Sequence, residues 1–286
     1  MKIDRVCQLS TRNFTQEYLR QNKPVVITDA LRQWTALGKW SLDYFKKNYG
    51  DKEFTCRGNN APSRLDAYID SLQDSSYESP VPYMRNINVQ PDFMELLPDI
   101  SPRLPYTEPD CLSSRWLPRH WLRHDNLHQL FISGIGTTIP LHFDDWMSCN
   151  FISNLVGVKE FTFYRPEDGP YLSPKKDDII ISEITNIYDV DKAKFPLFAK
   201  ATPYVVELGP GESLFVPSGW WHTSLTRECC ISISSSFVSR HHWHSFSREM
   251  RRLRTTESPF KAQLIFAYLS LVGVLLNTKA NLTGEN

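Results

Sequence analysis

Hydrophobic and polar residues alternate in short runs over the second half of the chain. From about residue 129 these runs predict β-strands, because side chains two residues apart share one face of a strand. Turn sequences such as Gly209-Pro210-Gly211 separate several of them. The expected strands are 129–134, 148–155, 158–164, 178–182, 203–208, 213–217, 220–225 and 229–238. About eight short strands within about 110 residues predict a two-sheet jelly roll, the double-stranded β-helix of a cupin barrel.

The first half of the chain reads as a mixture of short helices and strands. A helix is expected at 15–19, capped by Thr11 or Asn13, and a second at 42–47, capped by Ser41. Repeated prolines after residue 58 favour short helices and loops. The pattern of this half therefore does not predict a separate β-barrel.

These patterns predict a mainly β fold with flanking helices, divided into three parts. Residues 1–128 form a mixed helical and strand part that packs on the barrel. Residues 129–240 form the barrel, and residues 241–286 form a C-terminal helical appendage. The three parts are expected to act as one domain overall.

Composition adds limits on the class of protein. Hydrophobic residues make up 41% and aromatic residues 13% of the 286 positions, which supports a large core and excludes disorder. Lys plus Arg and Asp plus Glu number 32 each, so net charge favours no class of partner. The six cysteines contain no Cys-x-x-Cys pair and indicate reduced thiols. With no apolar signal segment at Met1–Arg5, we expect a cytoplasmic protein, or a nuclear one in a eukaryote.

One stretch, 262–276, is strongly apolar. It is too short to span a bilayer comfortably, and it contains Gln263, Tyr268 and Ser270. We therefore expect a buried or dimer-forming helix and no membrane partner.

His142, Asp144 and His222 are the main candidates for chemistry. His142 and Asp144 are two residues apart at the end of a strand-like run, so both can point into one barrel mouth. His222 follows Trp220 and Trp221 on a later expected strand. Two histidines and one carboxylate form a facial triad, which holds Fe(II) and leaves positions open for oxygen and a co-substrate. The competing interpretation is a hydrogen-bonded core histidine beside a turn aspartate.

Lys159 is a candidate cation for an acidic co-substrate. It shares a strand face with Phe161 and Phe163, which favours an inward side chain. An inward lysine is costly unless an anion meets it, and a dicarboxylate bound to iron would supply that anion. The alternative is a lysine that extends to the surface while Glu160 faces inward.

The run 240–254 is locally basic and contains three histidines. It can be interpreted as a surface for RNA phosphates or for an acidic protein segment. A second metal site or a solvated helix face are the other interpretations.

Near the first histidine, Asp145 and Trp146 are placed to shape the mouth of the substrate site.

The ordered motifs of this chain resemble those of the JmjC-type, cupin-like oxygenases that use iron and 2-oxoglutarate. The small hydroxylase branch is the most similar, including the asparaginyl hydroxylases and the tRNA wybutosine hydroxylase. The motifs that carry the resemblance are Lys23-Pro24-Val25-Val26-Ile27, Lys39-Trp40-Ser41-Leu42-Asp43-Tyr44, His142-Phe143-Asp144, Asn150-Phe151, Gly157-Val158-Lys159, Pro210-Gly211-Glu212-Ser213-Leu214-Phe215-Val216-Pro217 and Trp221-His222.

The resemblance implies that the triad binds Fe(II), with 2-oxoglutarate as co-substrate and O2 as oxidant. Lys159 would then pair with the distal carboxylate of 2-oxoglutarate. Other co-substrate contacts are expected at Tyr83, Asn150, Thr138 and Ser236. Thr138 is one step off the usual hydroxyl position, which Ile139 occupies, and Ser236 stands where some relatives have asparagine.

The function expected from this resemblance is hydroxylation of a protein side chain. Hydroxylation of a modified tRNA base, lysine demethylation and a non-catalytic cupin binding module are the alternatives. The expected partners are a protein or peptide substrate, tRNA under the second alternative, and a second copy of the chain bound through the C-terminal helices.

Overall fold

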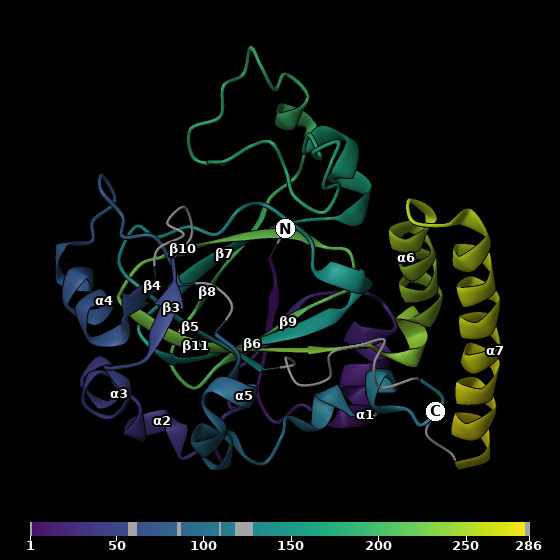
Figure 1. The fold of residues 1–286 in the computed structure, drawn as a ribbon, viewed down its shortest axis with the longest axis horizontal. Coiled ribbons are helices and arrows are strands. Elements are labelled where there is room, and N and C mark those ends of the chain that lie inside the picture. The colour runs from purple at the N-terminus through teal and green to yellow at the C-terminus, as the bar shows by residue number, and fades with distance from the viewer. Residues whose placement is uncertain (1, 57–61, 85–86, 109, 118–127, 284–286) are drawn as a thin grey trace.

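Two sheets that face each other form the centre of the molecule (Figure 1). The computed structural model describes residues 2–56, 62–84, 87–108, 110–117 and 128–283. Within these residues the larger sheet has the strand order β1 (Asp4–Val6), β2 (Val25–Ile27), β9 (Ser213–Val216), β6 (Cys149–Val156), β11 (Cys230–Phe237) and β5 (His128–Ser133). The smaller sheet has the order β10 (Trp221–Thr226), β7 (Lys159–Tyr164) and β8 (Tyr204–Leu208). The arrangement is the two-sheet barrel that the alternating pattern predicts.

The strands of the barrel lie within one residue of their expected bounds, except at 178–182. That expectation is wrong, because Ile181 and Ser182 form only isolated bridges. A tight turn causes this: the N–H of Ile181 donates to the carbonyl of Asp178, and the N–H of Lys175 donates to the carbonyl of Ile181. The chain thus turns back on itself before a longer ladder can form.

The N-terminal part contributes to the barrel itself. Strand β2 pairs antiparallel with β9, and β1 pairs parallel with β2, so both extend the larger sheet. A separate two-stranded ribbon, β3 (Glu53–Thr55) and β4 (Pro62–Arg64), lies outside the barrel. Residues 1–128 therefore supply strands as well as covering elements.

Short helices connect these strands. The α-helices before the barrel are α1 (Thr11–Asn13), α2 (Ala36–Lys39), α3 (Leu42–Tyr49), α4 (Leu65–Ser71) and α5 (Val89–Asp92), and α1 continues as a π-helix over Phe14–Leu19. Ser41 caps α3 as expected, since its Oγ accepts from the N–H of Tyr44. The expected cap of the first helix is wrong, because that helix begins at Thr11 and the Oγ of Ser10 accepts from the N–H of Asn13.

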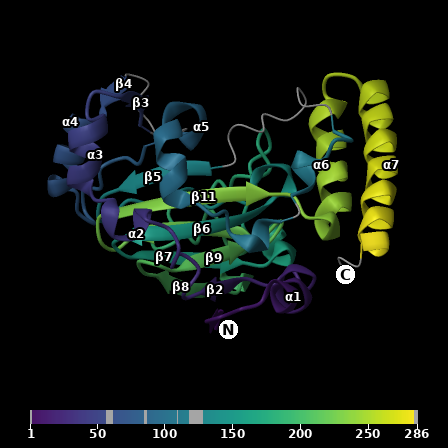
Figure 2. The same ribbon diagram turned by 90° about the horizontal axis from the view of Figure 1, so that it is seen from below.

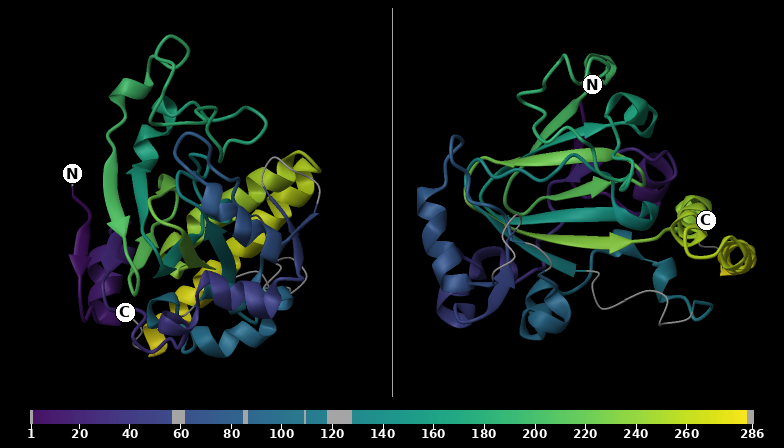
Figure 3. Two further views of the ribbon diagram at one scale, coloured as in Figure 1. Left: turned by 90° about the vertical axis from the view of Figure 1, so that its left-hand side faces the viewer. Right: turned by 45° about the horizontal axis from the view of Figure 1, so that its top comes forward.

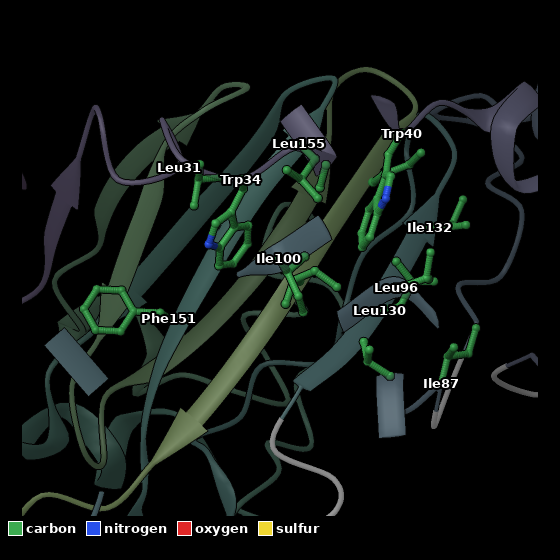
Figure 4. Close-up of a cluster of buried hydrophobic side chains, with 14 of the residues drawn as sticks. Leu31, Trp34, Trp40, Ile87, Leu96, Ile100, Leu130, Ile132, Phe151 and Leu155 are labelled. Atoms are coloured by element: carbon green, nitrogen blue, oxygen red, sulfur yellow. The ribbon is translucent and has the colours of Figure 1, made fainter. Parts of the chain in front are cut away.

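The outer face of the larger sheet carries the main hydrophobic core. Side chains from the strands pack against the N-terminal helices, as Figure 4 shows for Trp34 and Trp40 beside Leu155. Phe14 of the π-helix contacts the rings of Phe151 and Phe215 at centroid distances of 5.5 and 4.9 Å. This packing fixes strand β6, from which Asn150 reaches the opposite face of the sheet.

Two antiparallel helices close the chain. Helix α6 (Trp243–Thr255) lies against the barrel, and α7 (Pro259–Thr283) lies outside α6 (Figures 2 and 3). One face of α7 packs on α6 through Leu269 and Val272, whereas Phe260, Leu271 and Leu282 are 73%, 66% and 83% exposed.

Helix α7 is longer than the apolar stretch 262–276, which was expected to be too short to span a bilayer comfortably. At 25 residues it is about 37 Å long, because the helix continues past residue 276 without a break. By length and composition alone, its segment Pro259–Ala280 could cross a membrane, and only 22% of the apolar window is buried. Of the two expectations for this helix, a buried one is therefore wrong, and a dimer-forming one stays a prediction.

Candidate metal centre

His142, Asp144 and His222 converge in one cavity. His142 and His222 form an isolated antiparallel bridge, in which the N–H of each donates to the carbonyl of the other at 3.0 and 2.7 Å. The Oδ1 atom of Asp144 lies 4.0 Å from Nε2 of both histidines, and the three ligand atoms lie within 4.8 Å of one another. A metal–ligand bond to such atoms is about 2.1 Å, so one ion between them can contact all three after small side-chain shifts.

The second ring nitrogen of each histidine already has a partner. Nδ1 of His142 lies 2.8 Å from the carbonyl oxygen of Pro140, and Nδ1 of His222 lies 3.1 Å from that of Trp220. Because a carbonyl oxygen only accepts, each Nδ1 carries the proton and each Nε2 keeps its lone pair. These hydrogen bonds prepare both imidazoles as metal ligands.

Burial shifts the pKa values of His222 and Asp144. Burial lowers the pKa of His222 to about 3, with a smaller contribution from His142, so this ring is neutral at physiological pH. Burial raises the pKa of Asp144, against the smaller lowering effects of His142 and Asn150. Asp144 Oδ2 is buried without a hydrogen-bond partner among the described residues. A divalent cation would compensate this carboxylate, so the donor set fits a metal.

The ligand types favour iron. Imidazole and carboxylate without a thiolate match a facial triad better than a structural zinc site. In the described part of the chain, no other set of His, Cys, Asp and Glu ligand atoms gathers this closely. Among the histidines of the 240–254 run, His242 instead lies with its Nδ1 3.5 Å from Cys149 Sγ. A second metal site in that run is therefore unsupported.

The cavity around the triad has a volume of about 530 Å³. Asn150 and Ser236, both expected as co-substrate contacts, line it, and they are paired in register across β6 and β11. The amide of Asn150 exchanges hydrogen bonds with the hydroxyl of Ser234 at 2.7 and 3.0 Å. Asp145 and Trp146 also line the cavity. Polar groups from two strands therefore face the same space as the triad.

Lys159 lies deeper in the barrel and is only 5% exposed. Its Nζ donates to Ser232 Oγ at 3.3 Å and lies 5.6 Å from the ring centroid of Phe131, which lines the cavity. Burial lowers the pKa of Lys159, against a smaller effect of Cys230. The side chain points inward, as its spacing with Phe161 predicts, and it lacks an anionic partner in the described residues.

Two expected co-substrate contacts lie elsewhere. Thr138 pairs with Leu225 in an isolated bridge and does not line the cavity, because residues 137–141 form no continuous strand and Ile139 takes the inward position. Tyr83 is half-buried and is also not among the cavity-lining residues. Next to Tyr83, Met84 forms an isolated bridge with Cys56.

The two tryptophans before His222 are buried outside the cavity. Trp220 and Trp221 are 6% and 3% exposed, and neither lines the cavity. Trp220 packs in the core between the sheets, and Trp221 contacts Phe143 at a ring centroid distance of 4.9 Å. The buried Trp220 thereby positions its backbone carbonyl, which accepts from Nδ1 of His222.

Several cavity residues were not singled out from the sequence. Gln129 and Phe131 come from β5, and Ser234 comes from β11 beside Ser232, the partner of Lys159. The sequence does contain a pattern that indicates these residues: the serines at 232, 234 and 236 alternate with other residues and so share one strand face. A polar face on a barrel strand indicates a lined cavity.

Comparison with known proteins decides the family. The family model described as a cupin-like domain matches residues 11–241. The chain belongs to this cupin-like family. The resemblance noted from the sequence is thereby confirmed, since related proteins carry the names of demethylases and hydroxylases.

Three relatives show the range of these names. The arginine-specific demethylase JMJ20 of Arabidopsis thaliana is 26% identical over 267 residues, which cover 81% of this chain and 56% of that protein. The lysine-specific demethylase 8 of Xenopus tropicalis is 26% identical over 242 residues, or 79% of this chain and 50% of that protein. The bifunctional arginine demethylase and lysyl-hydroxylase psr-1 of Caenorhabditis briggsae is 24% identical over 254 residues, 83% and 61% respectively. This cupin-like chain thus spans roughly half to three-fifths of these relatives.

Proposed function

We propose that this cupin-like protein is an Fe(II)- and 2-oxoglutarate-dependent dioxygenase that hydroxylates a protein side chain. The observation that carries the proposal is the meeting of His142, Asp144 and His222 in a cavity whose wall residue Phe131 lies beside the buried Lys159. A metal-chelating dicarboxylate needs a metal at one end and a cation for its distal carboxylate at the other. The triad and Lys159 would supply these two groups.

Each residue has a distinct task in this proposal. When bound, the metal, 2-oxoglutarate and O2 supply the oxidising chemistry that replaces a substrate C–H bond by C–OH. The triad holds the metal, with both imidazoles oriented by their Nδ1 hydrogen bonds. Lys159 holds the distal carboxylate, and the Asn150–Ser234 pair orients the polar wall. Ile152 and Phe161 line the cavity with apolar surface and limit the water it can hold.

The names of the relatives support a protein substrate. JMJ20 and psr-1 are named for arginine demethylation, and psr-1 also for lysyl hydroxylation. Demethylation is the second candidate, because hydroxylation of an N-methyl group releases it by the same oxidative chemistry. The type of product then depends on whether the substrate presents a methyl group to the cavity.

The test compares Asp144→Ala with Asp178→Ala. Asp144 carries a ligand atom, whereas Asp178 is exposed and does not line the cavity. We expect the wild type and Asp178→Ala to retain iron and to convert 2-oxoglutarate to succinate, and Asp144→Ala to lose both. Iron binding and turnover in Asp144→Ala would refute the assignment of the triad. A wild type that neither binds iron nor converts 2-oxoglutarate would refute the proposed activity and favour a non-catalytic binding module.

Hydroxylation of a tRNA base gains no support from the basic run. Arg252 forms two hydrogen bonds with Glu249, and Arg254 pairs with Glu257. Arg251 stacks on the ring of Phe266 with its guanidinium 5.4 Å from the centroid. These local pairings match a solvated helix face. Retention on tRNA with a steep salt dependence would still favour the nucleic-acid alternative.

We also propose that the exposed face of α7 binds a second copy of the chain. Phe260, Leu264, Leu271, Val274 and Leu282 lie on this face and are each more than half exposed. Such an apolar face on a 25-residue helix is typical of an interface. Sedimentation should show a dimer at micromolar concentration, and Leu271→Glu should yield monomer. A monomeric wild type would exclude this pairing, and binding of the wild type to lipid vesicles would instead assign the face to a membrane.

A further inference from the structure

The wall of the cavity next to the triad is a short turn that continues directly from Asp144. The 3-10 turn η8 (Asp145–Met147) places both Asp145 and Trp146 on the cavity surface. Trp146 and Met147 have positive φ angles of 60° and 54°, a conformation that non-glycine residues adopt at a cost of about 1–3 kcal/mol each. Surrounding contacts hold this turn in place, which keeps Asp145 and Trp146 at the cavity surface.

Two contacts anchor the turn from outside the cavity. Ser218 Oγ donates to the carbonyl of Met147 at 2.6 Å. The indole of Trp146 packs against the cluster formed by Trp243, Phe246 and neighbouring residues of α6 and α7. Trp146 is at the same time one of the residues that line the cavity.

The carboxylate of Asp145 has no hydrogen bond or ion pair with the residues that the structure describes. Its charged surroundings include the acidic residues Asp144, Asp178 and Glu249, and His142 is also close enough to act on it. Arg252 is the nearby cation, and it is already engaged in a bidentate pair with Glu249 at 2.8 and 2.6 Å. Asp145 is therefore a cavity carboxylate without a partner of its own.

The charges within the site are balanced except for this group. Among the described cavity-lining residues only Asp144 and Asp145 are acidic, and none is Lys or Arg. A divalent metal together with Lys159 would offset Asp144 and the two carboxylates of 2-oxoglutarate. The charge of Asp145 then remains; the residue is exposed to solvent in the free protein, and a bound substrate is the group that can pair with it.

We infer that Asp145 and Trp146 select a substrate side chain that carries a positive charge, such as the guanidinium of arginine or the ammonium of lysine. The carboxylate offers a charge-assisted hydrogen bond, the indole face attracts a cation, and apolar wall residues accommodate an aliphatic stem. This inference rests on the proposed function. It disfavours the neutral amide substrates of the asparaginyl hydroxylases, to which the sequence also bears a resemblance.

The test uses matched small probes on protein loaded with Mn(II) in place of Fe(II) and saturated with 2-oxoglutarate. The first probe is Nα-acetyl-arginine methylamide, and its neutral counterpart is Nα-acetyl-citrulline methylamide, which has almost the same shape. Paramagnetic relaxation of the side-chain protons by Mn(II) reports binding near the metal without requiring turnover. We expect the arginine probe to bind about tenfold more tightly than the citrulline probe.

Asp145→Asn is the critical variant, and Asp178→Asn is its matched control, because Asp178 is an acidic neighbour that does not line the cavity. The preference for arginine should disappear in Asp145→Asn and persist in Asp178→Asn. Equal binding of both probes to the wild type, or equal losses in the two variants, would overturn the inference. Binding of Mn(II) and of 2-oxoglutarate is measured first, without probes; a failure there counts against the proposed function itself and not against the selection of charge.

Discussion

Replacing Lys159 by methionine should have opposite effects on the stability of the metal-free protein and on co-substrate binding. The Nζ atom can donate three hydrogen bonds, but Ser232 Oγ is the acceptor in the described residues, and the side chain is 5% exposed. Two N–H groups thus lack a protein acceptor, and each unmet buried donor costs about 1–3 kcal/mol. Methionine keeps an apolar chain of similar length and removes the charge.

At the lower limit the two unmet groups amount to about 2 kcal/mol. We therefore expect the free energy of unfolding of metal-free Lys159→Met to rise by about 2 kcal/mol, which corresponds to a Tm increase of about 4–8 °C. The affinity for 2-oxoglutarate should fall by about 100-fold or more, since a buried charged partner is worth about 3–5 kcal/mol. Thermal unfolding in a chelator and calorimetric titration of Mn(II)-loaded protein measure the two effects.

The stability difference should depend on pH with a defined sign. Because burial lowers the pKa of Lys159 below 10.5, the unfolded chain binds more protons than the folded one at pH values between the two pKa values. Wild-type stability from this group therefore rises with pH up to about 10.5, and the advantage of Lys159→Met shrinks over the same interval.

Lys192→Met is the control, because Lys192 is exposed on the loop between β7 and β8. It should change neither stability nor co-substrate affinity. A Lys159→Met protein that is less stable than the wild type and binds 2-oxoglutarate normally would refute the reasoning. It would show that the lysine serves packing and not an anion.

Further predictions concern the cavity wall and two glycines. Asn150→Ala should weaken 2-oxoglutarate binding in a calorimetric titration, whereas Thr138→Ala should leave it unchanged, since only Asn150 faces the cavity; an equal loss in both would restore Thr138 to the site. Gly157→Ala should lower the free energy of unfolding by about 3 kcal/mol or more in urea titrations, because Gly157 has φ +69° and an added Cβ would lie 2.1 Å from the carbonyl oxygen of Cys229. Gly38→Ala, also at positive φ but with no atom within 4 Å of the added Cβ, should cost only the backbone strain of about 1 kcal/mol, and equal losses would contradict the steric argument.

The barrel strands could be predicted because both faces of each strand are constrained. The inward direction of Lys159 followed from its alternation with Phe161 and Phe163, and the strand register places all three opposite Thr226, Ser224 and His222 of β10. The meeting of His142 with His222 could be expected from barrel closure, but residue spacing alone does not predict it, because it depends on pairing over a sequence separation of 80 residues.

Other features depend on three-dimensional packing and could not be read locally. Thr138 was expected only from the resemblance; in the structure it forms an isolated bridge with Leu225 and lies outside the cavity lining. Residues 178–182 have a strand-like sequence but fold into a turn. Their pairing with neighbouring segments is limited to isolated bridges at Ile181 and Ser182. The length of α7 exceeds the apolar run because Thr278 and Lys279 continue the helix as polar residues.

The shared sheet of the N-terminal strands and the barrel affects how this polypeptide can be shortened. A fragment that starts near residue 129 would lose β2, and β9 would then present a row of unpaired backbone N–H and C=O groups to solvent. It would also uncover the aromatic rings of Phe151 and Phe215, which Phe14 shields in the whole chain. Such a truncated product should self-associate through its new border instead of yielding a soluble, iron-binding unit.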